Sequence, residues 1–228
     1  MKDIFSRTAL LIGEDAILKL KNKHVALFGI GGVGSYVAEA LARCGVGHIT
    51  LVDKDNVDAT NINRQLIALH STVGKPKAEV AKMRIADINP DARVDALNIF
   101  YNAETSSQFN FSDFDYIVDA IDTVTSKLLL IENAKKEYIP IISCMGTGGK
   151  LNPSLFTVTD IKKTHTCPLA KVMRRELKNH GINSLKVVFS PEMPVKSSGV
   201  IPSISFVPSA AGLLIASEVI KDLTELPG

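Results

Sequence analysis

A glycine-rich turn between an apolar run and a periodic stretch constrains the fold of this chain more than any other feature. Residues 25–28 are apolar, residues 36–44 have helical periodicity, and Gly29, Gly31 and Gly34 lie between them in the pattern G-x-G-x-x-G. Glycine lets the backbone turn sharply and lets a phosphate approach closely, and the free N–H groups of a following helix attract an anion. The turn therefore predicts a nucleotide-phosphate site. By itself it does not distinguish a hydride-transfer enzyme from an enzyme that uses ATP.

Apolar runs and helical periodicity alternate along the first two thirds of the chain. We expect strands at residues 25–28, 48–52, 94–100, 116–122 and 139–144. We expect helices at residues 35–44, about 75–88 and 126–136, with a short helical lead-in at 8–22 that Gly13 interrupts. Strands that alternate with helices are joined by right-handed crossovers. The predicted fold is therefore an α/β, Rossmann-like, doubly wound and mainly parallel sheet.

The pattern changes after residue 150. We expect further strands at residues 155–159, 186–189 and 204–207, a basic helix at 169–180 and a final helix at 213–223. These strands would add antiparallel pairing to the sheet. A chain of 228 residues fits one domain. We therefore predict a single domain over residues 1–228, with a nucleotide-binding core at 1–150 and a substrate-side extension at 151–228 that completes the sheet.

Charge and cysteine content exclude several classes of protein. Lys and Arg number 26 against 24 Asp and Glu, so the whole chain is not an electrostatic nucleic-acid binder, and we expect no DNA partner. Cys44, Cys144 and Cys167 are scattered and form no C-x-x-C pair, which excludes a four-cysteine zinc site and a disulfide framework. They favour a reducing, cytoplasmic compartment. Residues 1–7 lack the apolar region of an export signal, and polar residues interrupt the apolar stretch 204–220, so we expect no membrane span.

Acidic residues stand at the ends of two predicted strands. Asp53 lies 19 residues after Gly34, near the spacing of a carboxylate that holds a ribose hydroxyl. Asp122 ends another strand, and ligands of parallel sheets lie at the carboxyl ends of strands. We therefore expect the glycine turn, Asp53, Asp122 and the glycines of 146–149 to meet at one crevice. Strand alternation favours Asp119 as a buried, hydrogen-bonded residue and not as a ligand.

Cationic side chains near this crevice favour ATP over a nicotinamide cofactor. Residues 53–65 form a long polar connection that contains Arg64, and Lys77 opens the next helix. Arg and Lys neutralise the charge that develops on transferring phosphates, and a carboxylate such as Asp122 can hold Mg²⁺. A nicotinamide enzyme has no special use for these groups. No G-x-x-x-x-G-K-[ST] segment occurs, so the chain is not a P-loop enzyme.

Five separated motifs resemble those of the ThiF/MoeB superfamily, which includes the ubiquitin-activating enzymes. They are residues 29–35, Asp53, residues 61–65, residues 74–77 and residues 119–122. The resemblance covers residues 5 to about 150. It implies an enzyme that adenylates a carboxylate with ATP and Mg²⁺ and releases pyrophosphate.

The resemblance assigns the nucleotide to the glycine turn and its polar neighbours. Gly31 and Gly32 would lie against the ATP phosphates, and Asp53 would hold the ribose. Lys77 would stabilise the transferring α-phosphate, and Asp122 would bind Mg²⁺. The full set of expected nucleotide-binding residues is Gly29, Gly31, Gly32, Gly34, Asp53, Asp55, Asn61, Arg64, Gln65, Lys77 and Asp122.

Two more features of the resemblance concern catalysis. Asn61, Arg64 and Gln65 would bind phosphates. Residues 5–7 are similar to an aromatic-x-arginine motif that reaches the ATP site of the partner subunit, so we expect a homodimer in which Arg7 acts in trans. The expected catalytic residues are Arg64, Lys77, Asp122 and Arg7.

The second half of the chain narrows the resemblance to one subgroup. Residues 160–164, 168–178 and 187–192 resemble the tRNA threonylcarbamoyladenosine dehydratases. This subgroup activates the threonyl carboxylate of a modified tRNA nucleoside, and a neighbouring atom of the same group displaces the adenylate to give a cyclic product. The resemblance also suggests a cysteine-desulfurase and sulfur-acceptor system as a partner. Two alternatives remain open, an activator of a ubiquitin-like sulfur-carrier protein and a non-catalytic nucleotide-binding scaffold.

A local excess of positive charge supports a tRNA substrate. Residues 160–186 hold seven Lys or Arg against two acidic residues, and phosphate contacts would use such a surface. We take Lys171, Arg174 and Arg175 as candidate tRNA contacts, although a basic helix is also typical of a solvated face. Cys167 lies where some relatives keep a reactive cysteine, but the resembling subgroup needs no enzymatic cysteine. The histidines show no metal-ligand spacing.

Overall fold

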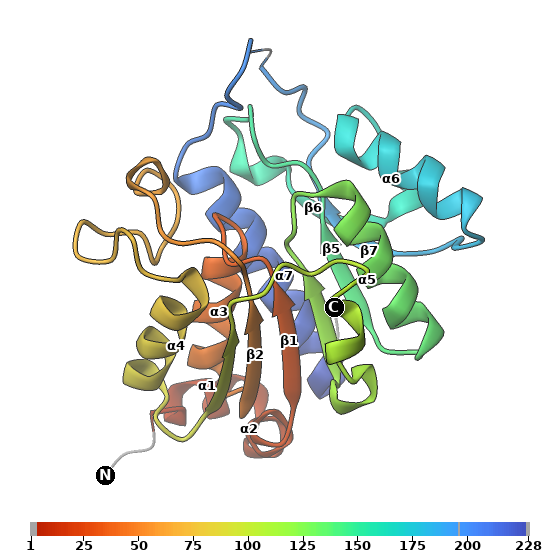
Figure 1. The fold of residues 1–228 in the computed structure, drawn as a ribbon. Helices are drawn as coiled ribbons and strands as arrows, with labels where there is room; N and C mark the ends of the chain where they lie inside the picture. The colour runs from red at the N-terminus through yellow and green to blue at the C-terminus, as the bar shows by residue number, and fades with distance from the viewer. Residues whose placement is uncertain (1–3, 196, 227–228) are drawn as a thin grey trace.

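The computed structural model describes residues 4–195 and 197–226, and its centre is a seven-stranded sheet with helices on both faces (Figure 1). The strand order is β3-β2-β1-β4-β5-β7-β6. All neighbouring strands are parallel except β6 and β7. The strands are β1 His24–Phe28, β2 His48–Val52, β3 Arg93–Leu97, β4 Tyr116–Asp119, β5 Ile141–Cys144, β6 Thr157–Asp160 and β7 Lys186–Phe189. This confirms the doubly wound, mainly parallel fold with an antiparallel strand from the C-terminal part.

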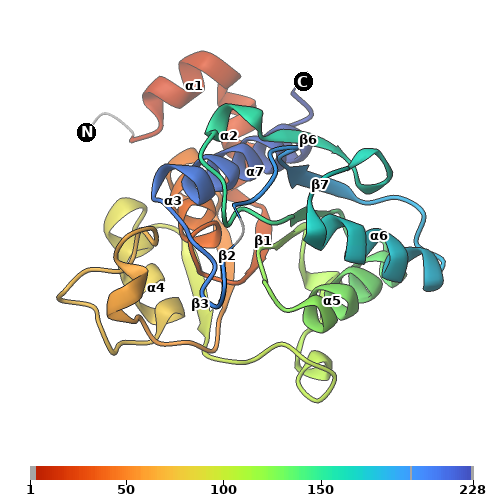
Figure 2. The same ribbon diagram turned by 90° about the horizontal axis from the view of Figure 1, so that it is seen from above.

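The residues that the structure describes form seven α-helices. They are α1 Ser6–Ile12, α2 Glu14–Lys21, α3 Gly34–Cys44, α4 Lys77–Ile88, α5 Val124–Lys136, α6 Pro168–Asn179 and α7 Phe206–Thr224. Short 3₁₀ turns occupy Ala59–Asn61, Ser106–Gln108, Phe111–Asp113, Pro153–Leu155 and Ile161–Lys163. Figure 2 shows α3 and α7 on one face of the sheet and α5 and α6 on the other. In the described residues, no helix combines the length and the apolar character needed to cross a membrane.

The two faces of the sheet carry separate cores because successive strand side chains point to opposite sides. In β1, Val25 and Leu27 join the core under α3 and α7, whereas Ala26 and Phe28 join the core under α5. Both faces are covered, so β1 is apolar from Val25 to Phe28, which is typical of a central parallel strand. The glycine turn therefore starts from a strand that is buried on both sides.

An irregular segment, residues 98–115, connects β3 to β4 in place of a helix. Its 3₁₀ turns place Tyr101 and Phe109 against Phe28, with ring centroids 5.0 and 5.3 Å from that of Phe28. These aromatic residues are buried. The segment thus completes the core on this face and brings residues 99–101 to the carboxyl end of β1.

Three sequence predictions are corrected. The strand expected at 204–207 is wrong, because Phe206 and Val207 begin α7, which buries an apolar face at helical spacing. Proline is tolerated in the first turn of a helix, so Pro208 does not prevent this. The strands expected to reach Phe100 and Asp122 end earlier, at Leu97 and Asp119, because the residues beyond them line the cavity described next.

Candidate active site

The glycine turn is held in place by close backbone packing. Gly29 has a φ of 90°, and a Cβ there would lie 2.6 Å from the carbonyl oxygen of Ala120. A Cβ on Gly34 would lie 1.8 Å from the carbonyl oxygen of Gly29. Only glycine fits at these two positions, because a Cβ at either would overlap backbone atoms, and the positive φ of Gly29 is one that residues with side chains rarely adopt. The turn therefore delivers Gly31 and Gly32 to the residues just before α3 begins at Gly34, at the positive end of the helix dipole.

A cavity of about 450 Å³ opens at the carboxyl ends of β1, β2 and β4. Ten of the eleven residues expected to bind the nucleotide line it: Gly29, Gly31, Gly32, Asp53, Asp55, Asn61, Arg64, Gln65, Lys77 and Asp122. Gly34 is buried behind the turn. Of the glycines at 146–149, Gly148 lines the cavity, while Gly146 packs against the sulfur of Cys167. The structure thus brings the glycine turn, Asp53 and Asp122 to one crevice, as the sequence pattern predicts, whereas Gly146 and Gly149 do not line it.

Asp53 ties the glycine turn to the end of β2. Its Oδ2 accepts a hydrogen bond from the N–H of Ile30 at 2.6 Å, and its Oδ1 accepts one from the N–H of Asp55 at 2.8 Å. Burial raises the pKa of Asp53, and these two N–H groups and Lys77 oppose the rise. Each carboxylate oxygen keeps a lone pair for a further donor.

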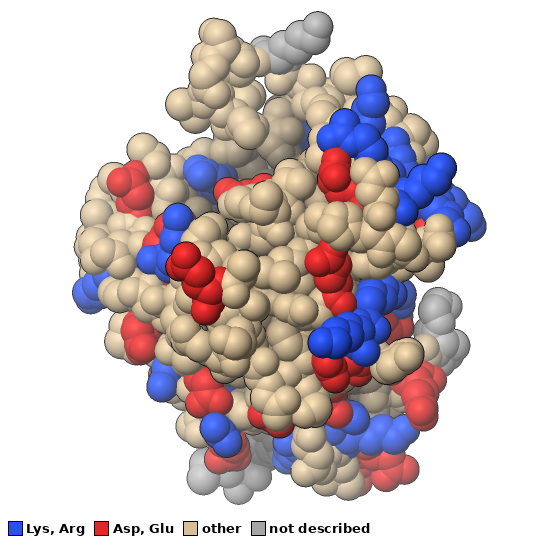
Figure 3. Space-filling view, turned by 45° about the vertical axis from the view of Figure 1, so that its right-hand side comes forward, with Lys and Arg blue, Asp and Glu red and all other residues tan. Residues whose placement is uncertain are grey.

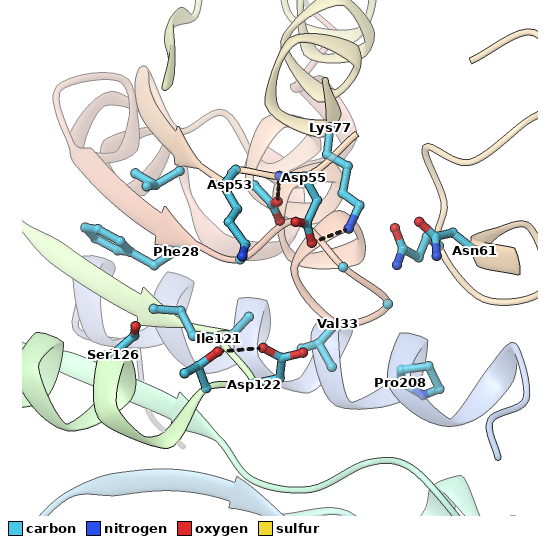
Figure 4. A pocket seen from close by; sticks show the side chains of 18 of the residues that line it. Phe28, Val33, Asp53, Asp55, Asn61, Lys77, Ile121, Asp122, Ser126 and Pro208 are labelled. Carbon is cyan, nitrogen blue, oxygen red and sulfur yellow. Dashed lines mark hydrogen bonds and ion pairs between the residues drawn. The ribbon is translucent and has the colours of Figure 1, made fainter. Parts of the chain in front are cut away.

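Lys77 and Asp55 form an ion pair at the edge of the cavity (Figure 4). Lys77 begins α4 and is only 6% exposed, and its Nζ lies 3.2 Å from Oδ2 of Asp55. The backbone supports this arrangement, because the Lys77 N–H donates to the Asp55 carbonyl at 2.9 Å. An anion in the cavity would meet a nearly buried ammonium group, where a charge interaction is stronger than in water.

The 3₁₀ turn Ala59–Asn61 and the residues after it carry three polar side chains into the cavity. Asn61 Oδ1 accepts from the N–H of Asp58 at 3.1 Å, which fixes Asn61 in a capping box. Arg64 donates to the carbonyl of Thr60 at 2.9 Å. Gln65 is buried, and its Oε1 has no hydrogen-bond partner among the described residues. Buried polar atoms are rarely left unsatisfied, so Gln65 fits a site that a polar ligand completes.

Asp122 faces the cavity from the loop after β4, on the side opposite Lys77 (Figure 4). Its carboxylate is exposed and accepts from Thr123 Oγ1 at 3.3 Å. Within residues 4–195 and 197–226, no group of three or more His, Cys, Asp or Glu could hold a metal ion. Mg²⁺ commonly takes only one or two carboxylates and completes its shell with phosphates and water, so Asp122 alone fits it.

Comparison with known proteins agrees with this site. Residues 5–227 match the ThiF family. The chain belongs to the ThiF family. It is 48% identical over 238 residues to a tRNA threonylcarbamoyladenosine dehydratase of Bacillus subtilis (strain 168), an alignment that covers 96% of this chain and 94% of the relative.

Solved structures and a more distant relative define the range of the similarity. The Escherichia coli tRNA N6-threonylcarbamoyladenosine dehydratase TcdA in complex with ATP has a TM-score of 0.92 and 39% identity, over 97% of this chain and 93% of that one. The ThiS sulfur-carrier adenylyltransferase of Bacillus subtilis (strain 168) is 35% identical over 64% of this chain and 45% of its own length. The similarity to the dehydratases is therefore greater in both identity and coverage.

The ThiF-family chain has an apolar end of the cavity that sequence reasoning missed. Phe28, Phe100, Tyr101 and Ile121 line it, and Lys54 Nζ lies 4.4 Å above the centroid of the Phe100 ring. The segment 94–100 has the pattern of a single strand, which conceals that Phe100 leaves the sheet. No local signal in the sequence distinguishes these positions from an ordinary strand end.

Four other candidate residues lie away from the cavity. Arg7 is exposed on α1, which packs at the opposite end of the sheet (Figure 1). Lys171 and Arg175 are exposed on α6, whereas Arg174 is half-buried and donates to the carbonyl of Thr164 at 2.8 Å. Arg174 therefore also anchors α6 to the segment before it.

The two cysteines nearest the cavity are buried. Cys167 is 1% exposed and its sulfur packs against Gly146. Burial raises the pKa of the Cys144 thiol to about 12. Thiolates, not thiols, act as nucleophiles, so Cys144 is suited to packing and not to attack.

Proposed function

We propose that this ThiF-family chain uses ATP to adenylate the carboxylate of threonylcarbamoyladenosine in tRNA and thereby drives its dehydration to a cyclic product. The observation that carries the proposal is the cavity that joins the glycine turn to Lys77, Arg64 and Asp122. Similarity to a dehydratase over 96% of the chain supports the choice of substrate.

The residues of the cavity fit ATP. Gly31 leaves room for phosphates, because the nearest atom to a Cβ there would be 3.9 Å away, whereas a Cβ on Gly32 would lie 3.2 Å from Pro208. Asp53 would accept from the ribose, and the apolar end at Phe28 and Tyr101 would hold the base. ATP supplies an adenylyl group that makes a carboxylate oxygen a good leaving group.

Lys77, Arg64 and Asp122 would act on the reacting end of the nucleotide. The Lys77 ammonium and the Arg64 guanidinium would stabilise negative charge at the phosphates as it develops. Asp122 would hold Mg²⁺, which would supply positive charge against the phosphates. Lys77 and Asp122 come from opposite sides of the cavity, so a phosphate chain would lie between them (Figure 4).

The decisive experiment is mass analysis of tRNA nucleosides, with the labile cyclic form preserved. Incubation with ATP, Mg²⁺ and this protein should remove one water from threonylcarbamoyladenosine. The Lys77→Met variant is the matched control and should leave the nucleoside unchanged. If the wild-type protein removes no water, the proposed substrate is wrong, although adenylation of another carboxylate could still hold.

Activation of a sulfur-carrier protein is the second candidate, because the chain is also similar to a ThiS adenylyltransferase. Pyrophosphate exchange that depends on a protein ending in Gly-Gly would support it. Exchange that depends on modified tRNA would support the dehydratase. ATP binding without either exchange would indicate a non-catalytic scaffold.

We propose a homodimer in which Arg7 completes the partner's site. Leu10 and Leu11 on α1 are 89% and 85% exposed, and a second copy of the chain would cover them. Arg7→Ala and Lys77→Ala would each be inactive alone. Mixed and reassembled, they should recover up to about a quarter of wild-type activity, since half of the dimers carry one intact site. No recovery would contradict action in trans.

We propose that the basic surface of α6 binds tRNA. Figure 3 shows Lys and Arg side chains gathered over α6 and its neighbours, which include the exposed Lys162, Lys163, Lys171, Arg175 and Lys178. This surface belongs to the proposed substrate-side extension, residues 151–228.

The three cysteines are free, as a cytoplasmic location would require. A sulfur-relay partner stays a prediction, which copurification from the native cell would test.

A further inference from the structure

A fully buried ion pair lies behind Asp122. Asp119 at the end of β4 and Lys127 in α5 are both 0% exposed, and Lys127 Nζ lies 2.8 Å from Oδ2 of Asp119. Removing two charges from water is costly, and apolar residues of the same volume often stabilise a fold as well or better. The ion pair therefore contributes little to the free energy of unfolding, and its hydrogen bonds indicate that it holds a segment of backbone in place.

Those hydrogen bonds converge on Ile121. Asp119 Oδ1 accepts from the Ile121 N–H at 3.1 Å, and Lys127 Nζ donates to the Ile121 carbonyl at 3.0 Å. Ser143 on β5 donates to Asp119 Oδ2 at 2.6 Å. Both peptide groups of Ile121 are thus held by charged side chains, and hydrogen bonds to ionised groups are about twice as strong as neutral ones.

We infer that this buried clamp, formed by Asp119, Lys127 and Ser143, positions Asp122 for Mg²⁺. Asp122 follows Ile121 directly, and its own carboxylate is exposed, with one long hydrogen bond from Thr123. The direction of the Asp122 side chain into the cavity is therefore set by the backbone at Ile121, which the clamp holds. Lys127 is a positioning residue in this scheme and does not contact the nucleotide. The inference rests on the proposed role of Asp122.

The test measures Mg²⁺ affinity by calorimetry, using the full chain and a non-hydrolysable ATP analogue. Lys127→Met removes the charge and both donors, and Mg²⁺ affinity should fall about 10–100-fold, the usual effect of losing a group behind a metal ligand. Binding of the metal-free analogue should change less than about threefold, and the Ile121 amide should exchange with solvent faster. Lys127→Arg, which keeps charge and donors, should recover part of the affinity.

Tyr116→Phe is the matched control, because it removes a partly buried hydrogen bond to Asp222 (2.6 Å) at the other end of the same strand. It should reduce stability and leave Mg²⁺ affinity unchanged. If Lys127→Met does not fold, Asp119→Asn/Lys127→Met removes both charges at similar volume and should show the same loss of affinity. Ser143→Ala keeps both charges and should weaken Mg²⁺ binding about threefold.

Wild-type Mg²⁺ affinity in the folded variants of Lys127 and Ser143 would overturn the inference. The variant Asp122→Asn separates this failure from that of the proposed function. If Asp122→Asn binds Mg²⁺ as tightly as the wild type, the metal role of Asp122 is wrong. If only Asp122→Asn weakens binding, the metal role stands and the clamp does not position the carboxylate.

Discussion

Alanine at Gly34 and alanine at Gly31 add the same methyl group to the same turn and should damage different properties. At Gly34 the new Cβ would lie 1.8 Å from the Gly29 carbonyl oxygen, whereas real Cβ contacts stay beyond 3.0 Å, so backbone must move by about 1.2 Å. Overpacking generally costs 1–3 kcal/mol, and a backbone atom cannot rotate away. We expect a loss of about 3 kcal/mol, or a fall in Tm of about 6–12 °C for a chain of this size.

At Gly31 the methyl group has room in the fold. The nearest atom would be Gln65 Nε2 at 3.9 Å, so the free energy of unfolding should stay within about 0.5 kcal/mol of wild type. The methyl group would instead occupy the cavity where the phosphates are proposed to bind. An overlap of about 1–3 kcal/mol there corresponds to ATP binding that is about 5–150-fold weaker.

Two assays on both variants separate these effects. Thermal unfolding without nucleotide reports the packing of Gly34, and calorimetric titration with ATP reports the cavity at Gly31. A Gly31→Ala protein that binds ATP as tightly as wild type would refute the assignment of phosphates to this turn. A Gly34→Ala protein with wild-type Tm would show that the turn relaxes far more easily than its packing suggests.

Three further predictions follow from single side chains. Lys77→Met should lower the rate of tRNA-dependent pyrophosphate exchange about 10²–10³-fold, the usual effect of removing one group that stabilises developing charge, and Lys77→Arg should retain more activity. Burial alone would raise the pKa of Glu39, but hydrogen bonds from Arg84 of α4 and from Arg43 leave this pKa below its ordinary value of 4.5. Ionised Glu39 therefore stabilises the fold at pH values above 4.5, and this stabilisation is lost as the pH falls through the lowered pKa. Glu39→Gln should therefore lower the free energy of unfolding by about 0.5–1 kcal/mol at pH 7 and by a smaller amount at pH 3 in urea titrations, and an equal loss at both pH values would contradict this sign. Arg175→Glu should weaken tRNA binding and reduce the salt dependence of that binding, with an unchanged Tm. Arg174→Glu should also lower the Tm, because the hydrogen bond of Arg174 to Thr164 is lost. Unaltered tRNA affinity in both variants would show that α6 is only a solvated face.

The sequence was sufficient for the central features of the fold and most of the cavity. Strand and helix periodicity are local properties, and the glycine turn is readable within a few residues. Parallel strands then bring their carboxyl ends to one edge of the sheet, so Asp53 and Asp122 meet the turn even though they are far apart in the chain. Lys77 was found in the same way, at the start of a helix that follows the crevice.

Other features depended on contacts between distant segments. Lys127 looks like an ordinary helix residue in the sequence, and only its packing against Asp119 makes it the partner of a buried charge. Phe100 ends a strand-like segment but lies outside the sheet, and Arg174 is held by Thr164 although its helix is predicted only as a basic surface. Periodicity shows which positions are apolar, but burial and charge pairing depend on what the folded chain brings next to each side chain.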